Sequence, residues 1–374
     1  MGQYKKFWYL LVAVLIGAFS ILGYYGFEVY REAPPIPQQY VSESGEKVIT
    51  HDDILHGQTA WQTTGGMQVG SVWGHGAYQA PDWTADWLHR ELTNWLDITA
   101  NQEFGKNFAD LNDEQQTLLK ARLTKEYRGS KVENGTVVLS NTRLAAMEKT
   151  AQYYISLYGD DPATKVTREH FAMKDNTLPD LQARKDLAKF FFWTAWTASA
   201  ERPNTHASYT NNWPHEPLIN NMPTPENVIW SIASVVFLIA GIGFVVWIWS
   251  FKKREDEKEP ATPEFDPLTK LQLTPSQRSL GKYLFTVLAL FVLQVTLGAV
   301  VAHYTVEGQE FYGIDISQYF PYSLVRTWHI QAALFWIAMA FLAGGLFLAP
   351  IINGGKDPKF QKLGVDVLYW ALVV

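Results

Sequence analysis

The chain has 374 residues, more than most single domains have, and a formal net charge of −6. Its mean hydropathy is close to neutral because long apolar stretches alternate with polar ones, and no basic patch typical of nucleic-acid binding is present. The sequence has no cysteine. That absence excludes disulfides, thiolate metal sites, cysteine nucleophiles and covalent attachment of a c-type haem through Cys-x-x-Cys-His.

Four apolar segments are long enough to cross a bilayer, at residues 7–27, 228–251, 283–302 and 324–352. A fifth begins near Leu363 and stops at Val374, well short of the ~20 helical residues that a crossing needs. We therefore expect the chain to be the front part of a larger membrane protein.

The positions of Lys and Arg predict the orientation of these segments. Basic residues precede the first span and follow the second and the fourth, whereas residues 303–325 contain none. The positive-inside rule then places residues 28–227 and 303–323 outside and residues 252–280 inside. The first span is too long for a secretory signal, and Tyr24 and Tyr25 stand where a cleavage site needs small residues, so we interpret it as an uncleaved anchor.

The outside segment is long enough to form its own core. Apolar residues at helical spacing predict helices over residues 110–127, 142–158 and 178–200. Asn134-Gly135, between short β-branched runs, is typical of a hairpin turn.

His329 lies near the start of the fourth apolar span. An imidazole at membrane depth is costly without a partner, so it marks a candidate functional site. Haem iron suits a single histidine that has Ala332 and Ala333 one turn below it, because small side chains leave room for a flat ring. The alternative is a histidine hydrogen-bonded to a neighbouring helix, and the local sequence favours neither.

His303 and Glu307 stand four residues apart at the outer end of the third span and would share one face of a continuing helix. An imidazole beside a carboxylate can accept the protons of a quinol at that depth. The alternative is an ordinary polar helix end, which the spacing alone favours.

Residues 70–78 form a glycine-spaced loop with aromatic residues. Glycines let backbone approach other surfaces closely, and carbonyls freed in this way can bind a hard cation such as calcium. The alternative is a loop that only packs on the membrane domain, and for His75 we expect packing or hydrogen bonding. The remaining histidines lack the spacing of a zinc site, and no phosphate loop, serine-hydrolase elbow or dinucleotide fingerprint is present.

Taken together, these motifs resemble the N-terminal half of a bacterial quinol-dependent nitric oxide reductase of the haem–copper oxidase superfamily. The motifs that carry the resemblance are an anchor helix, an outside domain with Gly-His-Gly-Ala-Tyr-Gln-Ala-Pro-Asp at residues 74–82, a second span, and then Arg-Thr-Trp-His at residues 326–329. The resemblance implies a mainly α, polytopic helical membrane protein with a periplasmic cytochrome-c-like domain that lacks haem c. The implied parts are an anchor at 1–30, the periplasmic domain at 31–227, a second helix at 228–251, a cytoplasmic loop at 252–280 and the start of the haem-binding bundle at 281–374.

The same resemblance implies roles for individual residues. His329 matches an axial ligand of the low-spin haem b, His303 and Glu307 match the quinol site, and the backbone of Gly76 and Tyr78 matches a calcium site that bridges haem propionates. The catalytic high-spin haem b3 and non-haem iron would be held by residues past Val374, so we expect no catalytic-centre ligand in this chain.

The implied function is reduction of two nitric oxide molecules to nitrous oxide and water, with membrane quinol as electron donor. The implied location is the bacterial inner membrane, crossed several times, and the partners are quinol, nitric oxide, the lipid bilayer and a second copy in a homodimer, but no nucleic acid. The alternatives are a quinol oxidase that reduces oxygen and a non-enzymatic membrane-anchored sensor.

Overall fold

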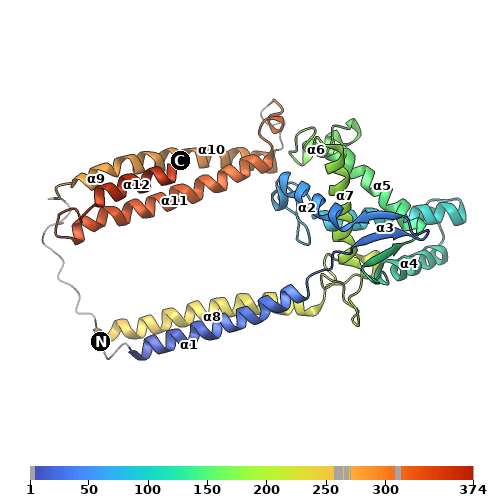
Figure 1. Ribbon diagram of the computed structural model, residues 1–374, viewed down its shortest axis with the longest axis horizontal. Helices are drawn as coiled ribbons and strands as arrows, with labels where there is room; N and C mark the ends of the chain where they lie inside the picture. The colour runs from blue at the N-terminus through green and yellow to red at the C-terminus, as the bar shows by residue number, and fades with distance from the viewer. Residues whose placement is uncertain (1–4, 257–263, 265–268, 270, 308–312, 374) are drawn as a thin grey trace.

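The computed structural model describes residues 5–256, 264, 269, 271–307 and 313–373, and four of its helices are long and apolar enough to span a membrane (Figure 1). They are α1 (Lys5–Arg31), α8 (Pro225–Asp256), α10 (Gly281–Val306) and α11 (Tyr322–Ile352). Each contains one of the four predicted spans. Parts of the predicted inner loop (257–263, 265–268 and 270) and of the predicted outer loop (308–312) lie outside the described residues.

The long helices all extend from one side of a folded domain (Figure 1). The last residues of α1 and α10 and the first residues of α8 and α11 face that domain. This arrangement agrees with the orientation predicted from Lys and Arg, in which the segment after the first span and the loop after the third lie on the same side.

The helices α10 and α11 pack against each other along their length (Figure 1). The short helix α9 (Pro275–Ser279) and the helix α12 (Gln361–Val373) pack against their inner ends, where the Tyr283 hydroxyl donates to the Val365 carbonyl at 2.8 Å. By contrast, the spanning segments of α1 and α8 bury none of their side chains within the chain, as expected of surfaces that face lipid.

The domain between α1 and α8 is built mainly from helices. They are α2 (His51–Thr63), α3 (Trp83–Phe104), α4 (Asp113–Arg128), α5 (Asn141–Leu157), α6 (Lys165–His170) and α7 (Leu181–Ser199). Short 3-10 turns are η1 (Gly66–Gln68), η2 (Phe108–Asp110), η3 (Pro162–Thr164) and η4 (Pro217–Ile219), and η7 (Ile316–Gln318) precedes α11. The predicted helices at 110–127, 142–158 and 178–200 correspond to α4, α5 and α7.

A small sheet closes one side of the domain. Its strands are β1 (Gln39–Ser42), β2 (Lys47–Thr50) and β3 (Thr136–Leu139) in the order β2-β1-β3. Asn134 and Gly135 form the predicted tight turn, with φ of 50° and 77° and reciprocal backbone hydrogen bonds between Glu133 and Thr136. The hairpin itself was wrong, because β3 pairs in parallel with β1 and not with the run before the turn.

Aromatic side chains fill the core of the domain. The second half of α7 is buried on every side, the pattern of a helix at the centre of a core. Trp87 stacks on Tyr154 with ring centres 5.0 Å apart, and Trp83 stacks on Phe191 at 5.7 Å. Aromatic pairs of this kind stabilise a core by about 0.5–1.5 kcal/mol beyond the burial of their surface.

A buried ion pair joins α3 to α5 inside this core. The side chains of Glu91 and Arg143 are 1% and 2% exposed, and Arg143 Nε lies 3.3 Å from Glu91 Oε1. The Trp87 indole donates to the other carboxylate oxygen at 2.7 Å, and the guanidinium lies over the Tyr127 ring at 4.0 Å. Each charge therefore has several partners, and removing one partner would leave the other charge buried and uncompensated.

We expect Glu91→Ala to lower the free energy of unfolding by about 3–5 kcal/mol, the usual cost of breaking a buried pair from one side. Glu103→Ala is the matched control on the same helix, because the Glu103–Arg122 pair is exposed and such pairs contribute at most about 1 kcal/mol. Urea unfolding of the purified protein, followed by tryptophan fluorescence, measures both. Equal losses in the two variants would contradict a structural role for the buried pair.

Candidate functional site

His329 is held against α10 by a hydrogen bond from its ring. Its Nδ1 lies 2.8 Å from the backbone carbonyl oxygen of Gln294. A carbonyl can only accept, so Nδ1 carries the proton and Nε2 keeps its lone pair. A neutral imidazole fixed in this tautomer by a backbone carbonyl is the usual form of a metal-ligating histidine.

Glycine at position 298 makes room for this ring. A Cβ atom on Gly298 would lie 2.8 Å from Cε1 of His329 and 3.1 Å from its Nδ1, closer than side chains tolerate. One turn below His329, Ala332 is buried and Ala333 is half-buried. The indole of Trp336 lies 3.4 Å from the Gln294 side-chain oxygen, which keeps a polar group beside the histidine.

These residues fit a haem ligand. A histidine that only bonds to a neighbouring helix accounts for Nδ1, but in the described part of the chain nothing hydrogen-bonds to Nε2. Sequence reasoning did not identify Gln294 or Gly298 as part of the site. The available signal was a glutamine followed four residues later by a glycine in an otherwise apolar span.

The pair formed by His303 and Glu307 lies at the outer end of α10. His303 Nδ1 is 2.5 Å from a Glu307 carboxylate oxygen, and the Glu307 amide donates to the His303 carbonyl at 3.1 Å. The prediction that the two share a face is therefore confirmed. The side chains are 30% and 42% exposed, so the pair can exchange protons with the outer surface. Along the helix, His303 lies about 14 Å from Gln294, nine residues at 1.5 Å each.

The loop at residues 70–82 is held by its own hydrogen bonds. Asp82 caps α3 by accepting from the Ala85 amide, and it also accepts from the Ser71 hydroxyl and the Gly74 amide, each at 2.6 Å. The Ser71 oxygen in turn accepts from the Gly76 amide at 2.7 Å. Burial raises the pKa of Asp82, although these hydrogen bonds act in the opposite direction. The loop backbone is therefore rigid before any ligand binds.

The predicted calcium-binding backbone at Gly76 and Tyr78 lies on the outside of this loop. Gly76 has a φ of 84°, which favours glycine, and the Tyr78 side chain is 77% exposed. Among the described residues no group of three or more His, Asp or Glu could hold a metal ion. A calcium ion here would depend on backbone carbonyls.

His75 packs on an aromatic neighbour. Its ring centre is 4.6 Å from that of Trp213, whose indole donates to the Gly74 carbonyl at 2.8 Å. This is the packing role that the sequence predicted for it.

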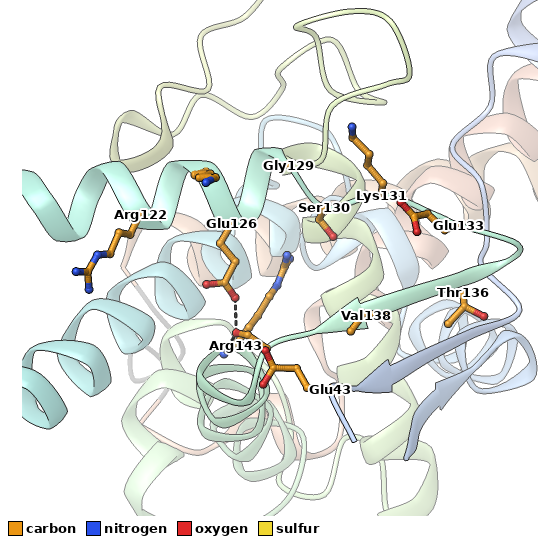
Figure 2. Close-up of a pocket in the computed structure, with 12 residues that line it drawn as sticks. Glu43, Arg122, Glu126, Gly129, Ser130, Lys131, Glu133, Thr136, Val138 and Arg143 are labelled. Atoms are coloured by element: carbon orange, nitrogen blue, oxygen red, sulfur yellow. Dashed lines mark hydrogen bonds between the residues drawn. The ribbon is translucent and has the colours of Figure 1, made fainter. Parts of the chain in front are cut away.

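A separate pocket of about 670 Å³ lies in the domain between α4, β3 and α5, away from these residues (Figure 2). Its wall mixes acidic and basic side chains, among them Glu43, Glu126, Lys131 and Arg143. The Glu126 carboxylate is already bonded to Ser140 and Trp95. With both signs of charge present and its central carboxylate occupied, this pocket has no preference for one class of ligand.

Two family models match the chain. The model for the cytochrome c-like domain of the nitric oxide reductase protein NorB matches residues 37–215, and that described as cytochrome c and quinol oxidase polypeptide I matches residues 278–374. The chain is a NorB-like member of the haem–copper oxidase superfamily. It is therefore a multi-pass membrane protein with a periplasmic cytochrome-c-like domain, and haem is the cofactor that its superfamily implies. No curated protein matches the chain.

We expect Gly298→Ala to displace the His329 ring, because the new methyl group would lie 2.8 Å from Cε1. If His329 binds haem, the low-spin haem absorption will weaken or shift in this variant. Gly344→Ala is the matched control, since nothing lies within 4 Å of its Cβ position on α11. Visible spectra of the purified proteins measure both, and an unchanged spectrum in Gly298→Ala would argue against His329 as a ligand.

Proposed function

We propose that the chain belongs to a quinol-oxidising nitric oxide reductase. The observation that carries the proposal is a NorB-type cytochrome c-like domain in a chain without cysteine. A covalent c-type haem cannot be attached to such a domain, so electrons need another donor. The His303–Glu307 pair at the outer end of α10 provides a place where membrane quinol can lose its protons.

The pair can remove both protons of a quinol in turn. Because a carboxylate only accepts, the Nδ1 of His303 donates to Glu307, and Nε2 is the basic nitrogen of the ring. Nε2 accepts a proton from a quinol hydroxyl, and the carboxylate stabilises the imidazolium that forms. Glu307, which is more exposed than His303, then passes the proton to the outer water. Two such steps and the loss of two electrons convert the quinol to the quinone.

His329 would hold the haem that receives these electrons, through Nε2 on its iron. When bound, the haem supplies one-electron transfer. The Gln294 carbonyl keeps the imidazole in one tautomer and orientation, and the backbone of Gly76 and Tyr78 would hold calcium at the outer edge. In the overall reaction, two nitric oxide molecules, two electrons and two protons give nitrous oxide and water.

The deciding experiment is anaerobic nitric oxide consumption by the purified full-length protein with a reduced quinol as sole donor. We expect quinol-dependent consumption with nitrous oxide as product. A haem-containing preparation that reduces oxygen and not nitric oxide would favour a quinol oxidase. A protein without haem would leave only the membrane-anchored sensor.

We expect Glu307→Gln to slow quinol-dependent turnover roughly a hundredfold, the lower range for loss of a positioned general base. The amide can no longer stabilise an imidazolium or carry a proton. Asp315→Asn is the control, because it removes another exposed outer carboxylate. An artificial donor that reduces the haem directly will support equal rates in all three proteins. A quinol-dependent rate equal to that of the unmodified protein would remove His303 and Glu307 from the proposed quinol site.

A further inference from the structure

Three polar residues lie on one face of α11, at its outer end. Tyr322, Arg326 and His329 are spaced by four and three residues, which puts them one above the other on a helix. Tyr322 is 1% exposed, and its hydroxyl has no hydrogen-bond partner among the described residues. Buried hydroxyls are almost always bonded, so one without a partner indicates a ligand that completes the site.

Arg326 is a second group without a partner. It is half-buried, and across the described ranges it makes neither an ion pair nor a hydrogen bond. Arg326 acts electrostatically on the Tyr322 hydroxyl, and so does Tyr78 of the loop at residues 70–82. An unpaired guanidinium at the start of a membrane span is costly unless an anion accompanies it. Its planar fork of donors matches the two oxygens of a carboxylate.

The periplasmic domain encloses this end of the helix. The Thr327 hydroxyl donates to the Gln68 side-chain oxygen at 3.0 Å, and the Tyr322 amide donates to the Ala172 carbonyl at 3.2 Å. Tyr322 also packs with Ala172, Tyr304 and Val325. An anion at Tyr322 and Arg326 would therefore lie between helix and domain.

We propose that Tyr322 and Arg326 bind a carboxylate of the haem that His329 holds. This inference rests on the proposed function, which puts haem iron at Nε2 of His329. Arg326 and Tyr322 lie about 5 and 10 Å further along the helix, three and seven residues at 1.5 Å each. A haem carries its two carboxylates on one edge, some ångströms from its iron, so a ring bound at His329 with that edge outward reaches both donors. The Tyr322 hydroxyl donates one hydrogen bond and the Arg326 guanidinium neutralises the charge.

The test uses the full-length protein containing haem labelled with ¹³C at its carboxyl carbons. Redox-difference infrared spectra identify the labelled carboxylate bands, and a titration measures the midpoint potential of the low-spin haem. Tyr322→Phe removes the hydroxyl and keeps the ring, and Arg326→Gln removes the charge. Tyr319→Phe, on an exposed outer turn, and Lys174→Gln, which removes a cation at the domain–helix boundary, are the controls.

We expect the labelled bands to shift in both test variants and in neither control. The midpoint potential falls in Arg326→Gln, because loss of the cation and exposure of the carboxylate charge both favour oxidised iron. It falls less in Tyr322→Phe. If Arg326→Gln loses its haem, Tyr322→Phe still decides, because its ring and packing are retained.

Labelled bands that stay unchanged in haem-containing Tyr322→Phe and Arg326→Gln overturn this inference alone, and the proposed function stands if quinol-dependent nitric oxide reduction persists. Shifts confined to phosphate bands overturn it in favour of a lipid headgroup. A wild-type protein without haem overturns both the inference and the proposed function.

Discussion

A bilayer offers no water to a buried polar group, so each polar side chain on α10 and α11 needs a partner within the protein or from a ligand. The described helices meet this requirement in two ways. His329 bonds to the Gln294 backbone and His303 bonds to Glu307, whereas Tyr322 and Arg326 have no partner in the described part of the chain. This contrast locates the proposed haem and quinol sites, because paired groups are held in place and unpaired groups await a ligand.

The periplasmic domain follows a different rule, since its core is stabilised without a cofactor. Stacked aromatic rings and the Glu91–Arg143 pair occupy its interior. A family match to a cytochrome c-like domain therefore coexists with a protein core that is complete by itself. What the domain contributes to the membrane helices is contact and shape, through Gln68 and Ala172 at the outer end of α11.

The sequence predicted the features whose causes are local. Length and hydropathy were enough for the four spans, because each needs only its own residues, and the four-residue spacing was enough for the His303–Glu307 contact. The helix α3 was missed because Thr84, Glu91 and Thr99 lie on its buried face and interrupt the apolar periodicity. The bond from His329 to Gln294 joins residues 35 positions apart, so only the packing of α10 on α11 could reveal it. The pairing of β3 with β1 was missed for the same reason.

Asp82 connects two parts of the domain that have separate purposes. It ends the loop at residues 70–82 and begins α3, and its carboxylate holds Ser71 and Gly74 while capping the helix. The shape of the loop is thus inherited from the folding of the longest helix in the domain. A cation that meets the Gly76 and Tyr78 carbonyls would find them already in place, and little ordering of the backbone would oppose its binding. Such a loop is a template for its ligand, whereas a flexible loop would have to be shaped by it.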